Sequence, residues 1–151
     1  MSLWYRIFAQ SSESIDPNTL LEHLHTTGYP IQANFLKDDL GWFEATFSLE
    51  GSEVSLQLFH SDEKGVRAEL DAFAAWIESQ HTELNQIELM ERVVTAKQVF
   101  AFEIPDEQAN IEKVRQFCYH VSEFLVGQTQ GLMQVDGEGL FDADGQLLLR
   151  E

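Results

Sequence analysis

The chain has 151 residues, 26 acidic and 9 basic side chains, a formal net charge of −17 and one cysteine. This length is enough for a single domain, residues 1–151, with its own hydrophobic core. The negative charge repels phosphates and anionic headgroups, which argues against direct binding to nucleic acid or a membrane. One cysteine excludes an intrachain disulfide, and no signal-peptide pattern or membrane-spanning apolar run is present, so we expect a cytoplasmic protein.

The first part of the chain predicts a strand, a helix and a meander. Residues alternate over 3–10, which places Tyr5 on one face of a strand and Arg6 on the other. Asp16 is a suitable N-cap for a helix over 17–27. Three extended stretches follow, over residues 31–37, 41–49 and 53–60. Together these elements form a first β-α-β-β(-β) unit, residues 3–60.

A helical linker is predicted over residues 61–94. Val66, Leu70 and Ile77 recur at helical spacing, whereas residues 82–92 suit either a helix or a strand, and we expect a short helix there. The second unit, residues 95–150, repeats the order of the first. It comprises a strand over 95–104, a helix from about Ile111 that ends near Gly127 and Gly131, and extended stretches over 132–135 and 147–150.

Two turn sequences suggest that the chain contains an imperfect tandem duplication. DDLGWFEA at 38–45 matches DGEGLFDA at 136–143 with an offset of 98 residues, 136 minus 38. Acidic residues and glycine are common in β-turns, so chance similarity is the alternative. The predicted fold class is α+β, with one or two antiparallel sheets carrying helices on one face and an imperfect duplication of a β-α-β-β unit.

This order of elements is similar to that of the vicinal oxygen chelate superfamily, whose domains pair two β-α-β-β-β modules around a metal site. The resemblance implies metal ligands from a histidine on each module's first strand and a carboxylate on its last. Residues 3–10 and 95–104 contain no histidine, and the second unit is one strand short. The comparison is therefore topological, and we predict neither a metal nor a cofactor.

A few polar residues are candidates for chemistry. Related turns would place Asp38 and Asp136 at equivalent ends of the two units, lining one cleft with Asp39 and Glu138. Paired carboxylates raise one another's pKa and can divide into an acid and a base. Acidic residues in β-turns usually face water, which is the alternative reading. His60 completes this candidate set.

Other polar residues have simpler explanations. His81 follows the second helix and His120 flanks an apolar helical stripe, so we interpret both as solvated or capping residues. Cys118 has apolar neighbours at helical spacing, which predicts a buried thiol rather than a nucleophile.

Two functional hypotheses follow. The first is a non-enzymatic binding or regulatory module whose acidic surface engages a basic protein partner, as immunity and adaptor proteins do. The alternative is a small-molecule-binding or metal-dependent, lyase-like enzyme with a cleft between the two repeats, using His60, Asp38, Asp136 and Glu138. Homodimerisation through an exposed sheet edge is compatible with either.

Overall fold

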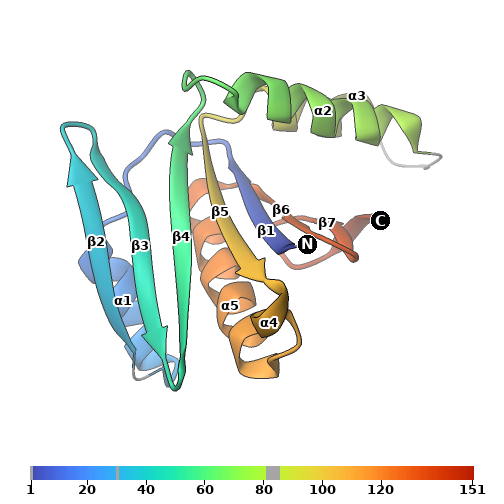
Figure 1. Cartoon of the computed structure of the whole chain (residues 1–151). Coiled ribbons are helices and arrows are strands. Elements are labelled where there is room, and N and C mark those ends of the chain that lie inside the picture. The colour runs from blue at the N-terminus through green and yellow to red at the C-terminus, as the bar shows by residue number, and fades with distance from the viewer. Residues whose placement is uncertain (1, 30, 81–85) are drawn as a thin grey trace.

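A computed structural model describes residues 2–29, 31–80 and 86–151 (Figure 1). All eight strands of these residues join one antiparallel sheet in the order β2-β3-β4-β5-β1-β6-β7-β8, which confirms the α+β class. The strands are β1 (Ser2–Ala9), β2 (Gln32–Asp38), β3 (Gly41–Leu49), β4 (Ser52–His60), β5 (Gln98–Pro105), β6 (Leu132–Val135), β7 (Gly139–Phe141) and β8 (Leu147–Arg150). The helices are α1 (Pro17–Thr26), α2 (Val66–Ser79), α3 (Gln86–Val94), α4 (Asp106–Ala109) and α5 (Glu112–Thr129).

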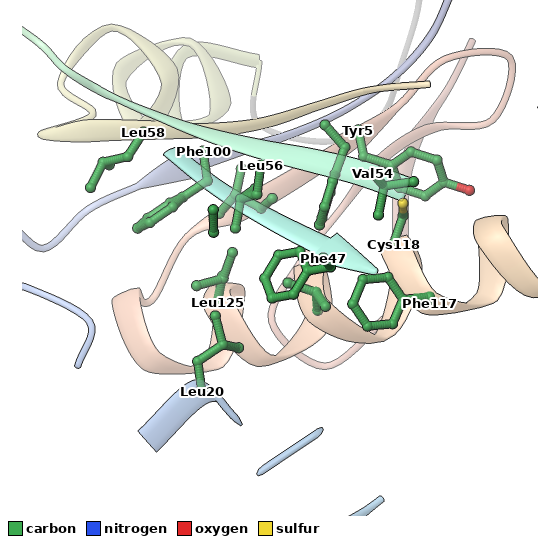
Figure 2. Packing of buried hydrophobic residues seen from close by; sticks show 14 of the residues in the cluster. Tyr5, Leu20, Phe47, Val54, Leu56, Leu58, Phe100, Phe117, Cys118 and Leu125 are labelled. Carbon is green, nitrogen blue, oxygen red and sulfur yellow. The ribbon is translucent and has the colours of Figure 1, made fainter. Parts of the chain in front are cut away.

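The larger core lies between one face of the sheet and the helices α1 and α5. Because side chains alternate along a strand, β4 and β5 send every second residue into this layer, and β3 does the same from Ala45 onward, after an irregularity in its pairing with β2 that also turns Trp42 inward. Figure 2 shows Phe47 and Phe100 of the sheet meeting Leu125 and Phe117 of α5, with Leu20 of α1 nearby. The Phe47 and Phe117 rings pack edge to face, with centroids 5.2 Å apart.

The opposite face of the sheet is covered only at one end. There Phe8 of β1, Val99 of β5 and Leu132 of β6 pack against Leu70 and Ile77 of α2 in a second apolar cluster that also includes α3. The helices therefore lie on both faces rather than on one, because the ends of these central strands are apolar on both sides. We call this partly covered side the open face (Figure 1).

Most predicted element boundaries agree with the structure. Asp16 caps α1 as expected, since its Oδ1 accepts a hydrogen bond from the backbone N–H of Asn18 at 2.9 Å. The last long helix ends between the two glycines expected to mark its end, because α5 continues past Gly127 to Thr129 and its C-cap is Gln130, in the left-handed conformation at φ 54°. Leu125, Val126 and Thr129 are buried, and this packing outweighs the low helical propensity of glycine.

Two helices, α2 and α3, make up most of the described part of the segment between the two units. Residues 86–94 form α3, in agreement with the expected short helix. The backbone N–H groups of Thr95 and Ala96 still donate to carbonyl oxygens of α3, so β5 begins at Gln98 rather than at the expected residue 95. His81 and the remainder of the ambiguous stretch, residues 82–85, lie outside the described residues. Among the described helices, none is both long and apolar enough to cross a membrane.

The two predicted units contribute to one sheet in different ways. Their first strands, β1 and β5, pair at its centre, β4 lies beside β5, and β6 lies beside β1. The turn at 38–41 therefore lies at the β2 edge of the sheet, whereas the turn at 136–139 follows β6, with β3, β4, β5 and β1 between them. The duplication itself stays a prediction.

Candidate functional site

A row of paired residues crosses the open face from one edge of the sheet to the other. Its members, strand by strand, are Leu36, Glu44, Gln57, Ala101, Arg6, Gln134, Leu140 and Leu149. The segment of residues 61–79, which contains α2, borders this row, and two hollows open between them. The two hollows make this border the candidate site, because ligands and partner side chains bind in clefts.

Arg6 is the central cation of the row. Its Nε donates to Glu69 Oε1 of α2 at 2.9 Å, and its Nη1 donates to Gln134 Oε1 at 2.8 Å and to Asp136 Oδ1 at 3.2 Å. The guanidinium carbon lies 4.7 Å from the ring centroid of Trp4 and 4.9 Å from that of Phe73. The side chain is only 14% exposed, so these carboxylates and aromatic rings replace most of its water.

Asp136 is held in place by the backbone as well as by Arg6. Its Oδ2 accepts a hydrogen bond from the Trp4 N–H at 3.0 Å, and its own N–H donates to the Trp4 carbonyl oxygen at 3.1 Å. Gln134, which is 2% exposed, donates from Nε2 to Asp136 Oδ1 at 2.9 Å. The carboxylate thus extends the β1–β6 ladder by one residue and completes a partly buried polar network.

The first of the two hollows, the arginine hollow, surrounds this network. Its volume is about 250 Å³, and it is lined by Arg6, Phe73, Trp76, Gln134, Asp136 and Glu151. Arg6 pairs here with Glu69 and Asp136, and Glu151 is a third carboxylate near it, so this hollow already holds a cation of the protein itself.

The second, the acidic hollow, lies near the β2 edge. Its volume is about 260 Å³, and it is lined by Asp38, Phe43, Glu44, Gln57, Leu58, Phe59 and Glu63. Within the described chain, the ion pairs involve Arg6 and Lys113, and none reaches these carboxylates. The hollow therefore combines uncompensated negative charge with apolar surface.

Large apolar side chains are exposed beside the acidic hollow. The exposed fractions are 43% for Leu36, 76% for Leu40 and 41% for Phe43. Asp38 shapes this edge, because its Oδ1 accepts a hydrogen bond from the Leu40 N–H at 2.8 Å and so closes the β2–β3 turn. Contiguous exposed apolar patches are common at interaction sites, which makes this edge a candidate for one.

The predicted site residues are distributed over separate places, except that Asp136 and Glu138 share one hollow. Asp38 lines the acidic hollow, Asp136 lines the arginine hollow, and Asp39 is exposed in the β2–β3 turn. His60 ends β4, and its backbone N–H donates to Glu63 Oε2. The structure therefore does not bring Asp38 and Asp136 together in one cleft.

Glu138 lines a third hollow, on the side of the sheet covered by α5. This hollow has a volume of about 420 Å³ and is also lined by Asp136, Tyr5, Tyr119, His120 and Arg115, so the structure brings Asp136 and Glu138 to one hollow. Burial raises the pKa of Tyr5 to about 12, with smaller contributions from Cys118 and Glu138, so its phenol keeps its proton at neutral pH.

The sequence reasoning missed Arg6 and Phe73. A signal for Arg6 was present, because it alternates with Trp4 and Phe8 on one face of a strand, and an arginine among aromatic residues is often stacked and paired. Phe73 lies at helical spacing from Leu70 and Ile77, and nothing local indicates that its ring reaches Arg6.

Neither a metal centre nor a reactive thiol is found in the described residues. They contain no group of three or more histidine, cysteine or acidic side chains arranged to hold a metal ion. Cys118 is fully buried, and burial raises the pKa of its thiol well above the ordinary range, so the reactive thiolate is disfavoured. Comparison with protein-family models, curated proteins and solved structures finds no match for this chain.

Proposed function

We propose that this protein is a non-enzymatic binding or regulatory module that engages a basic protein partner through the acidic hollow. The observation that carries the proposal is the set of three carboxylates without a cationic partner, Asp38, Glu44 and Glu63, beside the aromatic residues Phe43 and Phe59. Arginine and lysine side chains combine an apolar stem with a cation, so both parts find suitable surface there.

The surroundings of Arg6 illustrate how such a side chain would bind. Within the protein itself, the Arg6 guanidinium lies against two aromatic rings and donates to two carboxylates. The acidic hollow offers the same kinds of groups without the arginine. A partner's arginine would therefore meet an environment that this fold already uses to stabilise a guanidinium.

Charge alone does not produce a stable complex, and burial of exposed apolar residues is the second source of affinity. Leu36, Leu40 and Phe43 stand exposed around the hollow and would be buried by a partner. The overall charge of −17 would accelerate the approach of a basic protein, since long-range attraction acts mainly on the association rate.

The test compares two variants of equal net charge. Asp38→Asn, Glu44→Gln and Glu63→Gln together neutralise the acidic hollow, while Glu22→Gln, Glu107→Gln and Glu123→Gln neutralise three exposed carboxylates on α1, α4 and α5. Binding of hexa-arginine is measured by calorimetry at about 0.15 M salt, where distant charges are largely screened. We expect the first variant to bind about tenfold more weakly than the wild type and the second to bind almost as well.

The same pair of variants can then be used on whole-cell extracts. The wild type and the second variant should retain one basic protein that the first variant loses. Equal weakening of hexa-arginine binding in both variants would show that the attraction is non-specific, and the acidic hollow would then not be the site.

A further inference from the structure

The third hollow lies between the start of α5 and the turn that follows β6. We call it the tyrosine hollow, because Tyr5 and Tyr119 line it together with Arg115 of α5 and Glu138 of the turn. Its volume of about 420 Å³ lies within the range of about 300–1,000 Å³ that is usual for small-molecule sites. From the groups in its wall we propose that it binds a zwitterion, an amino acid with an apolar side chain, independently of the acidic hollow.

Tyr5 supplies a buried polar group that has no partner. Its side chain belongs to the larger core and is only 3% exposed, yet its hydroxyl makes no hydrogen bond within the described residues. Figure 2 shows this oxygen, in red, projecting away from the packed side chains, and the residue lines the tyrosine hollow. Because burial raises the pKa of the phenol to about 12, the hydroxyl keeps its proton and can both donate to a carboxylate and accept from an ammonium group. Buried polar groups normally have a partner, and here a ligand can supply it.

Two side chains of opposite charge lie near this hydroxyl. After burial and Cys118, the charge of Glu138 raises the pKa of Tyr5 and that of Arg115 lowers it, so both charges are close to the phenol. Neither side chain takes part in a hydrogen bond or an ion pair within the part of the chain that the structure describes. The two charges therefore do not neutralise each other. A ligand carboxylate can pair with Arg115 while a ligand ammonium group pairs with Glu138.

Three other polar side chains of the wall already have partners in the protein. These pairs are Asp136 with Arg6, His120 with Tyr29 and Glu112 with Gln116. Arg6 balances the charge of Asp136, and Glu112 lies in the first turn of α5, where the helix dipole stabilises its charge. The groups left for a ligand are one cation, one anion and the phenols, which match a zwitterion. Arg115 would repel an amine alone, and Glu138 would repel a carboxylate alone.

The wall also offers apolar surface for the side chain of the ligand. Leu3 and Tyr119 are half-buried, pack against the larger core and line the tyrosine hollow. An aliphatic or aromatic group placed there would be removed from water by residues that are already in position. The hollow therefore favours an amino acid with an apolar side chain over one with a polar side chain.

The experiment titrates the full chain by calorimetry with phenylalanine, phenethylamine and hydrocinnamate, which share one aromatic body. Phenethylamine lacks the carboxylate of phenylalanine, and hydrocinnamate lacks its ammonium group. We expect one phenylalanine to bind per chain and each analogue to bind about tenfold more weakly, because one charge-assisted contact is lost. Absence of saturable phenylalanine binding, or an analogue that binds as tightly as phenylalanine, would overturn the proposal.

Two charge variants locate the site by their opposite effects on the analogues. Arg115→Gln should weaken the binding of phenylalanine and hydrocinnamate about tenfold without weakening that of phenethylamine. Glu138→Gln should weaken the binding of phenylalanine and phenethylamine about tenfold without weakening that of hydrocinnamate. Both side chains are exposed, so both variants should fold. Unchanged phenylalanine binding in either variant would place the ligand elsewhere and overturn the proposal.

The matched controls change exposed charges on the other side of the sheet. Lys64→Gln, before α2, and Asp71→Asn, within α2, should bind phenylalanine like the wild type. Tyr5→Phe removes only the buried hydroxyl and should weaken phenylalanine binding about fivefold, and wild-type affinity in this variant would contradict the proposal. Hexa-arginine binding at the acidic hollow should be unaffected by saturating phenylalanine, so the two proposals can fail separately.

Discussion

Arg6 Nη1 donates to Asp136 Oδ1 across 3.2 Å, which joins β1 to the turn that follows β6. The same guanidinium donates to Glu69, so a single side chain connects the centre of the sheet to α2. The carboxylate also binds the backbone of Trp4. Asp136, which the sequence suggests as a candidate for acid–base chemistry, therefore has a structural role in this network.

Replacement of Arg6 by methionine tests how much this network contributes to the free energy of unfolding. Arg6→Met keeps an unbranched apolar chain but leaves Asp136 and the buried Gln134 without their cationic donor. We expect a loss of about 2 kcal/mol in the free energy of unfolding, measured by urea denaturation. Lys113→Met removes an exposed ion pair instead and should cost less than about 0.5 kcal/mol. Equal effects of the two substitutions would contradict a central role for Arg6.

Two glycines should respond to alanine in opposite directions. Gly139 has φ 133°, and an added Cβ would lie 2.0 Å from the carbonyl oxygen of Leu149, so Gly139→Ala must disrupt the β7–β8 pairing. Gly127 lies inside α5 with no heavy atom within 4 Å of an added Cβ. We expect Gly139→Ala to lower the melting temperature and Gly127→Ala to stabilise by about 0.5–1 kcal/mol. A rise in melting temperature for Gly139→Ala would show that β8 does not lie against Gly139 of β7 as in the structure.

The stability of the fold should decrease at alkaline pH. The pKa of Tyr5 is about 12 in the folded protein against an ordinary value of 10.0, so the unfolded chain loses this proton first. The contribution of Tyr5 is therefore complete below about pH 10 and is lost as the pH rises towards 12. The burial of Cys118 acts in the same direction from its ordinary pKa of 9.0 upward.

Urea unfolding across this pH range tests whether Tyr5 causes the loss of stability. The wild type should lose stability as the pH rises, and Tyr5→Phe should show a smaller slope above about pH 10. Part of the slope should remain, because burial also raises the pKa of Tyr29 and Tyr119. An identical slope in wild type and Tyr5→Phe would exclude Tyr5 as a source.

Cys118 should be protected from thiol reagents in the folded state. Its side chain is fully buried in the larger core, and the raised pKa leaves the thiol protonated. We expect a chromogenic disulfide reagent to react slowly in native buffer and rapidly in urea. Fast reaction in native buffer, at a rate independent of unfolding, would mean that α5 does not pack Cys118 into the larger core as the structure has it.

The sequence by itself determined the secondary structure wherever one local signal was strong. Alternation over the first strand separates Tyr5 from Arg6, and both faces are as expected, because the two-residue period of a strand needs no tertiary information. The same holds for the cap at Asp16 and for the apolar stripe of α2. The end of α5 between Gly127 and Gly131 is also as expected, and the helix continues past Gly127 because the propensity cost of one glycine, about 1 kcal/mol, is smaller than the gain from burying the last turn.

Only the tertiary structure decided how the elements combine into a site. Strand order is a non-local property, and it places Asp38 at the β2 edge while Asp136 joins Arg6 at the centre of the sheet. No local pattern brings Glu69 and Phe73 of α2 to Arg6, which lies more than sixty positions earlier in the chain. The acidity was evident from composition, but the gathering of Asp38, Glu44 and Glu63 in one hollow depends on strand pairing and on the chain that leads into α2.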